Sequence, residues 1–264
     1  MTYEEAVLAL RAAGCVYAED EAAVIWETYA DPAARDRAVA DRTTGRPLEQ
    51  VVGWAAFGPV RVALAPGVFV PRRRAEAILA PAVALRSDAR VVVDLGCGAG
   101  ALAASLAVLL PDATVHGVDL DEAALACARR TGGFTVHRGS WWSGLPSSLA
   151  GRVDLAVAYL PHVPTSRLPG IHQDFRAHEP AVSVDGGPDG LDPLRAVLTD
   201  ADHWLAPGGA FVTLVSPDQA AVLHLAVLAS DDDDVVVAHQ RPSSSSNVAT
   251  PLRTTDSPES NSLP

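Results

Sequence analysis

Hydrophobic and polar residues recur along most of the chain with the spacings of strands and helices. Apolar runs at residues 91–93 and 114–118 have the length and composition of buried strands, and an Ala/Leu-rich helical pattern follows the first of them. Strand and helix patterns alternate from about residue 75 to residue 215. This alternation predicts an α/β fold with a doubly wound, mostly parallel sheet.

Two other patterns precede this region. Residues 3–42 have helical apolar spacing, with Gly14 expected to end the first helix and Asp31-Pro32 to begin the third. Residues 54–64, with a Gly58-Pro59 turn, predict a β-hairpin. We therefore expect four parts: a small N-terminal helical domain (1–44), a β-hairpin linker (45–78), a main domain (79–250) and a disordered Ser/Pro/Thr-rich tail (251–264).

Closely spaced glycines follow the first strand of the main domain, in the stretch Asp94-Leu95-Gly96-Cys97-Gly98-Ala99-Gly100. Glycines let the backbone approach a ligand, and the helix behind them presents unpaired N–H groups. Asp119, which ends the next strand, suits a pair of ribose hydroxyls. A dinucleotide fingerprint has its third glycine later, so this spacing favours S-adenosyl-L-methionine (SAM). Asp94 would then lie near the amine of SAM or order the loop.

Four polar or aromatic residues fall at predicted strand ends: Asp94, Asp119, Ser140 and Tyr159. Ligands of parallel sheets bind beyond the carboxyl ends of the strands, so we expect these residues to ring one pocket.

Composition narrows the function classes. The chain has 264 residues, is 48% hydrophobic, carries a net charge of −12 and contains no Lys. This acidity argues against a nucleic-acid partner, and the lack of Lys excludes Schiff-base chemistry on Lys. No apolar run is long enough for a membrane span, and the N-terminus lacks the positive charge of a signal peptide, so we expect a cytoplasmic protein that does not bind a membrane. Nothing demands a dimer, so a monomer or weak dimer is expected.

Other charged and metal-binding residue types give weaker signals. The cluster 72–74 of three arginines fits either a solvated turn or a binding role, and the acidic run 231–234 is expected to be a solvated loop. Cys15, Cys97 and Cys127 lie far apart and the histidines are scattered, so we expect no metal site and no disulfide.

Seven stretches resemble, in order and spacing, the protein-glutamine methyltransferases of the PrmC/HemK type. They are GRPLEQVVG, PGVFVPRRRAE, VVVDLGCGAGALA, VHGVDLDEAAL, RVDLAVAYLPHVPT, HEPAVSVDGGPDGLD and LAPGGAFV, and they cover about residues 45–216. The resemblance implies a seven-stranded Rossmann-like sheet and methyl transfer from SAM to the GGQ-loop glutamine of a peptide-chain release factor. The cofactor-binding residues that we assign are Asp94, Gly96, Cys97, Gly98, Gly100, Asp119, Leu120, Ser140, Trp141 and Tyr159.

The family's catalytic motif Asn-Pro-Pro-Tyr matches Tyr159-Leu160-Pro161-His162 here, and these four residues are the candidate catalytic site. In the family, the Asn side-chain carbonyl and the next backbone carbonyl accept the two hydrogens of the substrate amide. Such positioning is most of the catalysis available to a weak amide nucleophile. Tyr159 has no amide carbonyl, and Gln173 in the following loop is the candidate substitute.

Other positions also depart from the family. Its adenine-contacting acid appears as Ser140, followed by Trp141 and Trp142, and its Glu in the fifth strand appears as Leu214. Glu179 matches the family's Glu-Pro pair and could shape the pocket or cap a helix.

Three functions fit these observations. The chain could methylate the release-factor glutamine, or it could methylate a small-molecule hydroxyl, amine or carboxylate. In the second case His162 would act as a general base and Tyr159 as an orienting hydroxyl, although His162 could equally fill the family's Tyr position. In the third, the chain would bind SAM without transferring a methyl group.

Overall fold

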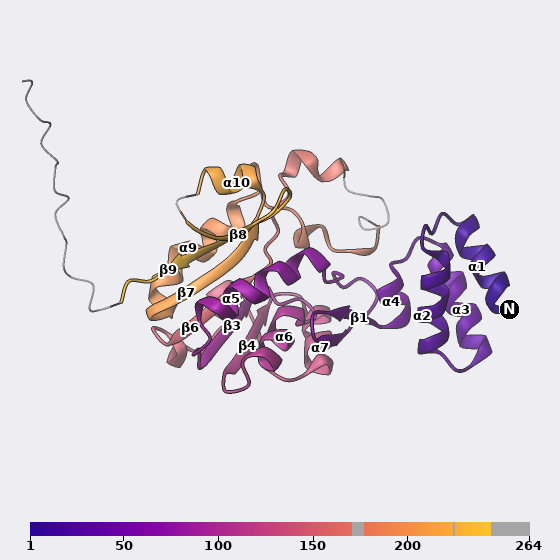
Figure 1. Cartoon of the computed structure of the whole chain (residues 1–264), viewed down its shortest axis with the longest axis horizontal. Helices are drawn as coiled ribbons and strands as arrows, with labels where there is room; N and C mark the ends of the chain where they lie inside the picture. Colours follow the sequence, from indigo (N-terminus) through magenta and orange to yellow (C-terminus); the bar gives the residue numbers. More distant parts are fainter. Residues whose placement is uncertain (171–176, 224, 244–264) are drawn as a thin grey trace, which may run out of the picture.

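A seven-stranded sheet forms the centre of the molecule (Figure 1). The computed structural model describes residues 1–170, 177–223 and 225–243, so Gln173 and the expected disordered tail lie outside the described residues. The strand order is β5-β4-β3-β6-β7-β9-β8. Strands β5, β4, β3, β6 and β7 run parallel to one another, whereas β9 is antiparallel to both β7 and β8. The strands are β3 (Val91–Leu95), β4 (Thr114–Asp119), β5 (Thr135–Arg138), β6 (Val153–Ala158), β7 (Leu205–Val215), β8 (Ala226–Ser230) and β9 (Val235–Gln240).

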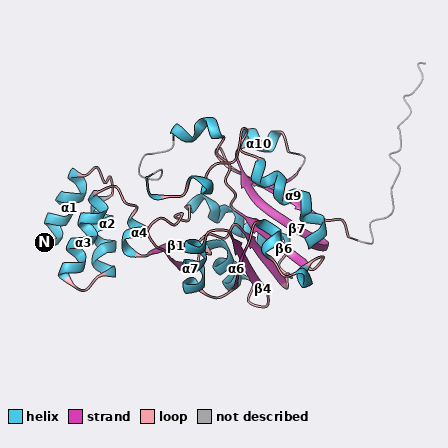
Figure 2. Ribbon diagram, turned by 180° about the vertical axis from the view of Figure 1, so that it is seen from behind, coloured by secondary structure: helices cyan, strands magenta, loops and turns pink. Residues whose placement is uncertain are grey.

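This sheet confirms the predicted doubly wound α/β fold, and helices cover both of its faces (Figure 2). On one face, Leu102 and Leu106 belong to the same buried core as Val92 of β3. On the other face, Leu194 and Val197 belong to a core with Phe211 of β7. The helices of this region are α5 (Leu79–Leu85), α6 (Ala101–Leu109), α7 (Glu122–Thr131), α9 (Asp192–Trp204) and α10 (Pro217–Ala221).

The N-terminal helices pack around their own core at one end of the molecule (Figure 1). They are α1 (Tyr3–Ala12), α2 (Ala18–Thr28), α3 (Pro32–Thr43) and the short α4 (Leu48–Val52). As expected, α1 ends just before Gly14, which has a positive φ, and the Asp31 side chain caps α3 at Pro32. Leu10 and Ile25 are fully buried in this core, and Val52 of α4 also belongs to it.

Strands β1 (Trp54–Phe57) and β2 (Val60–Ala63) form the expected antiparallel hairpin, with Phe57 paired to Val60. Phe57 and Val62 are buried in the core that also contains Leu102 of α6. The hairpin therefore packs against the main domain and shares its hydrophobic core. No helix in the described part of the chain combines the length and apolar character of a membrane span.

Two sequence expectations need correction. The helix expected from about Ala75 starts as the 3₁₀ turn η1 (Arg73–Ile78) and becomes α-helical only in α5. Pro81 lies in the first turn of α5, where its missing N–H is tolerated. The acidic run is also not wholly solvated, because Asp234 is 8% exposed and forms an ion pair with Arg74. A buried carboxylate needs such a partner.

Candidate active site

The glycine loop leaves β3 and is fixed to the end of the neighbouring strand. The backbone N–H groups of Gly96 and Cys97 both donate to the Val118 carbonyl, at 2.8 and 2.9 Å. A cavity lies beside this loop. Its wall is formed by Phe57, Phe69, Pro71, Arg72, Ala75, Asp94, Gly96, Cys97, Gly98, Ala99, Ala101, Leu102 and Tyr159. The structure therefore brings five predicted site residues together in one cavity: Asp94, Gly96, Cys97, Gly98 and Tyr159.

Asp94 is a buried carboxylate with an unused oxygen. Its side chain accepts the Ala103 N–H at 3.0 Å through Oδ2, whereas Oδ1 has no partner among the described residues. Burial raises the pKa of Asp94 to about 7, and the negative charge of Asp119 adds to this rise. A buried acid in this state is stabilised by a cationic group that approaches its free oxygen, so the site fits the amine of SAM.

Gly98 of the glycine loop is hydrogen-bonded to Asp119 at the end of β4. Gly98 has a φ of +54°, and a Cβ there would point into open space, which leaves room for a ligand against the backbone. Asp119 accepts the Gly98 N–H at 2.8 Å through Oδ2 and the Asp121 N–H at 2.9 Å through Oδ1. Asp119 therefore holds the loop from behind and does not line the cavity itself.

The other assigned cofactor residues lie around the cavity rather than in its wall. Gly100 begins α6, and Leu120 is 60% exposed beyond β4. Ser140 precedes the 3₁₀ turn η2 (Trp141–Gly144), and the Trp141 ring lies over Gly96, 3.1 Å from where a Cβ would stand. Asp119 and Ser140 are not among the residues in the wall of this cavity, and the expectation that they ring one pocket with Asp94 and Tyr159 stays a prediction. The Trp141–Gly96 contact instead covers the outer side of the loop.

Trp142 has a structural role that differs from that of its neighbour. It is 1% exposed, and its indole N–H donates to the Val197 carbonyl of α9 at 2.8 Å. Leu214, at the position of the family's Glu, is fully buried in β7. Both side chains belong to the core of the domain.

The four candidate catalytic residues follow the end of β6. Tyr159 lines the cavity, and its ring lies 6.4 Å from that of Phe69 and 5.4 Å from that of His162. Burial raises the pKa of Tyr159, so the phenol is protonated at neutral pH. Leu160 is buried, and its carbonyl accepts a hydrogen bond from His162 Nδ1 at 2.9 Å. Pro161 is half-buried between them.

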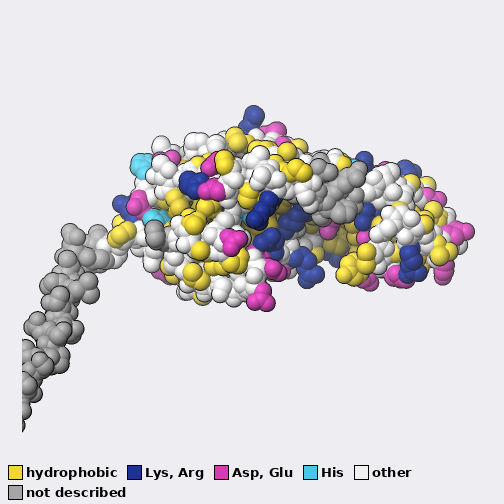
Figure 3. All heavy atoms as spheres, turned by 90° about the horizontal axis from the view of Figure 1, so that it is seen from above, with side chains coloured by type: hydrophobic (Ala, Val, Ile, Leu, Met, Phe, Trp, Pro, Cys, Tyr) yellow, Lys and Arg dark blue, Asp and Glu magenta, His cyan; other side chains and the backbone are white. Residues whose placement is uncertain are grey.

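Two ion pairs flank Tyr159, and neither pairing was predicted from sequence patterns. Arg72 pairs with Glu179, whose side chain is 2% exposed, and Arg74 pairs with Asp234. Glu179 also accepts the Val70 N–H at 3.1 Å, so it joins the segment before η1 to the wall of the cavity. Figure 3 shows arginines gathered near the middle of one face, with acidic side chains beside them.

Among residues 1–170, 177–223 and 225–243, no three His, Cys, Asp or Glu side chains come together as a metal site. The three cysteines are buried, and burial raises the pKa of the Cys97 thiol well above its usual value. Cys97 therefore serves as an apolar wall of the cavity.

Comparisons with known proteins find similar sequences and structures. Residues 59–148 match the family model "Methyltransferase small domain". Among solved structures, the Thermus thermophilus 16S rRNA N2 G1207 methyltransferase RsmC matches with a TM-score of 0.46 and 18% identity, over 72% of this chain and 44% of that chain.

Three curated relatives, each named release factor glutamine methyltransferase, align over most of this chain. The Moorella thermoacetica protein is 36% identical over 74% of this chain and 72% of its own length. The Gloeobacter violaceus protein is 37% identical over 70% of this chain and 66% of its own length. The Mycolicibacterium smegmatis protein is 40% identical over 67% of this chain and 64% of its own length. The chain thus spans slightly less than two thirds of the length of two of these three relatives, those from Gloeobacter violaceus and Mycolicibacterium smegmatis. The chain belongs to the family of release factor glutamine methyltransferases, as the motif resemblance predicted.

Proposed function

We propose that the chain transfers a methyl group from SAM to a glutamine side chain of a peptide-chain release factor, in the cytoplasm. The observation that carries this proposal is the cavity, whose wall contains both the Asp94–Gly98 loop and Tyr159, the first residue of the catalytic motif. Asp94 and Gly98 would hold the cationic amino-acid part of SAM. Tyr159 and the residues after it would receive the acceptor.

A second candidate keeps the cofactor and changes the acceptor. Tyr159 stands where the family has Asn, and this change favours an acceptor that is not an amide, such as a hydroxyl or an amine. The glycine-loop side of the cavity does not involve Tyr159, so the change leaves the proposed cofactor side of the cavity as it is.

Two measurements on one sample test the proposal. Calorimetry would first measure SAM binding, and the release factor would then be added and its intact mass determined. We expect binding followed by a mass gain of one methylene group on the factor. Binding without that gain would overturn the release-factor substrate and leave the second candidate. Failure to bind SAM would overturn the proposal as a whole.

The control is Asp94→Ala, which removes the only carboxylate that the described residues contribute to the wall of the cavity. We expect this variant to fold and to lose SAM binding. Unchanged binding would show that Asp94 does not hold the cofactor.

A further inference from the structure

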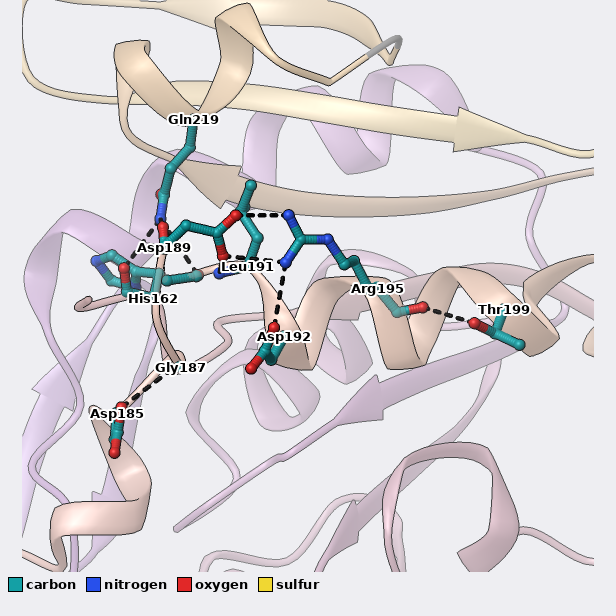
Figure 4. Close-up of polar contacts among 10 residues, drawn as sticks. His162, Asp185, Gly187, Asp189, Leu191, Asp192, Arg195, Thr199 and Gln219 are labelled. Atoms are coloured by element: carbon teal, nitrogen blue, oxygen red, sulfur yellow. Dashed lines mark hydrogen bonds and ion pairs between the residues drawn. The ribbon is translucent and has the colours of Figure 1, made fainter. Parts of the chain in front are cut away.

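The backbone of His162 is held rigidly from one side. Its carbonyl accepts the Gln219 side-chain N–H at 3.0 Å, and the same group reaches the carbonyls of Asp189 and Gly190 at 3.3 and 3.2 Å. Gly190 has a φ of +80°, and a Cβ there would collide with the His162 carbonyl. Figure 4 shows the Gln219 side chain reaching the backbone of His162, with the His162 ring directed away from the Asp189–Arg195 ion pair. The position of the imidazole is therefore set by the fold.

The hydrogen-bond partner of one ring nitrogen of His162 determines whether that nitrogen carries a hydrogen. Nδ1 lies 2.9 Å from the Leu160 carbonyl, and a carbonyl oxygen can only accept a hydrogen bond. Nδ1 therefore carries the hydrogen, and Nε2 of the neutral ring carries a lone pair. Within the described ranges, no residue donates to Nε2.

The same bond changes what the motif offers to an acceptor. The Leu160 carbonyl is the backbone group that follows the first motif residue, and it is already engaged by His162. Tyr159 supplies no amide carbonyl. His162 Nε2 and the Tyr159 hydroxyl are two side-chain acceptors of this segment to which no described residue is hydrogen-bonded. Tyr159 lines the cavity, and the His162 ring lies 5.4 Å from the Tyr159 ring.

We infer that His162, fixed as the Nδ1–H tautomer by the Leu160 carbonyl, uses Nε2 to accept the N–H or O–H of the methyl acceptor, next to the Tyr159 hydroxyl. His162 thereby replaces the amide and backbone carbonyls that the family motif would supply. This inference rests on the proposed function for the methyl transfer itself, whereas the state of the imidazole can be measured without any turnover.

The proton and the electrons balance in the transfer step. The acceptor nitrogen or oxygen forms a bond to the methyl carbon, the carbon–sulfur bond breaks, and its electron pair stays on sulfur. The acceptor's proton passes to Nε2, so the positive charge that began on the sulfonium ends on the imidazolium of His162. Solvent then removes that proton.

Several charged and polar groups face the imidazole and affect its titration. Burial lowers the pKa of His162, the Leu160 bond raises it, Arg74 lowers it and Asp234 raises it, and the Tyr159 ring packs against it. The net direction is downward from the ordinary value, so the ring is neutral at pH 7 and gains a proton only in the acidic range. The rate should therefore fall as the pH falls through that range, because an imidazolium has no lone pair to offer.

The first experiment reads the tautomer directly. Nitrogen NMR of the full chain with labelled histidine, at about pH 7.5, would be compared with the spectrum of His162→Gln to identify the His162 signals. We expect a protonated Nδ1 and an unprotonated Nε2. A protonated Nε2, or a ring that is charged at this pH, would overturn the inference whether or not the protein methylates anything.

The second experiment compares His162→Phe with His203→Phe, a matched change of an exposed histidine outside the site. We expect His162→Phe to bind SAM as the wild type does and to lose about 100-fold in kcat. We also expect its kcat to lose the fall at acidic pH that the wild type shows. His203→Phe should change neither. A His162→Phe variant with wild-type kcat and an unchanged fall at acidic pH would overturn the inference. If instead the wild type binds SAM but leaves the release factor unmodified, the proposed function fails, and the NMR result still decides the state of His162.

Discussion

At the scale of single residues, Asp94 links cofactor binding to pH. In the free protein its pKa is raised to about 7, so below that pH the carboxyl is largely protonated. A cationic amine beside Oδ1 favours the ionised form, so binding must release a proton when the pH is below the raised pKa. We expect SAM affinity to increase as the pH rises from about 6 to about 8. Calorimetry in two buffers of different ionisation enthalpy would count the proton released.

Asp94→Asn is the control for this prediction. Its Oδ1 can still accept the Ala103 N–H that Asp94 accepts at 3.0 Å, but the group no longer titrates. We expect weaker SAM binding with no slope between pH 6 and pH 8. If the slope persisted in the variant, another group would be responsible for it.

Arg72 supports a second prediction at the residue scale, because it faces a carboxylate that is almost fully buried. The Glu179 side chain is 2% exposed, and burial raises its pKa while the Arg72 charge lowers it. Arg72→Ala would leave this carboxylate without its cation, which typically costs about 3–5 kcal/mol. We expect a loss of about that size in the free energy of unfolding measured in urea.

The matched variant is Arg129→Ala, whose partner Glu122 is 56% exposed. Exposed ion pairs contribute about 0–1 kcal/mol, so this variant should unfold almost as the wild type does. Equal losses in the two variants would mean that Arg72 acts through its packing on Phe69, where its guanidinium lies 4.6 Å from the ring centroid, and not through its charge.

At the scale of elements, the loop that carries Gly190 positions the catalytic motif. Gly190→Ala would place a methyl group against the His162 carbonyl and the Gln219 side chain. We expect a clear loss of stability and a fall in kcat with little change in SAM affinity. Gly133→Ala is the control, because Gly133 has a φ of +86° but no atom within 4 Å of the added Cβ. Both variants carry the cost of placing Ala at a positive φ, so the difference in stability between them measures the collision of the added methyl group at residue 190.

Thermal unfolding and single-turnover methylation would measure these two effects. If Gly190→Ala and Gly133→Ala behaved alike, the loop would not hold His162 in place.

The elements themselves could be predicted well, because they depend on local patterns. Short apolar runs between helical patterns predicted the parallel strands, Asp31-Pro32 predicted the start of α3, and the Gly58-Pro59 turn predicted the hairpin. The pairing of Arg74 with Asp234 could not be predicted, because these residues are 160 positions apart and an acidic run usually stays in solvent. The hydrogen bond that sets the His162 tautomer is local, yet it depends on the backbone path after β6, which no sequence pattern specifies.

At the scale of the whole molecule, Gln50 joins three distant segments and supports the last prediction. It lies in α4, and Val52 of the same helix packs in the N-terminal core. The side chain of Gln50 is almost fully buried. Its Nε2 donates to the carbonyls of Val68 and His178, both at 2.9 Å, and its Oε1 accepts the Gly67 N–H at 3.3 Å.

Gln50→Ala would leave these backbone groups without partners away from water, at a cost of about 1–3 kcal/mol. We expect faster hydrogen exchange confined to residues 66–70 and 177–180, together with weaker SAM binding, because the first of these segments carries Phe69 in the wall of the cavity. Gln240→Ala is the control, because that side chain is exposed and makes one bond of 3.3 Å to Gly208. Faster exchange spread over α1 to α3, with residues 66–70 unchanged, would contradict this role and assign Gln50 to the helical core alone. The expected result would show that the N-terminal unit fixes the cavity wall through a single buried amide.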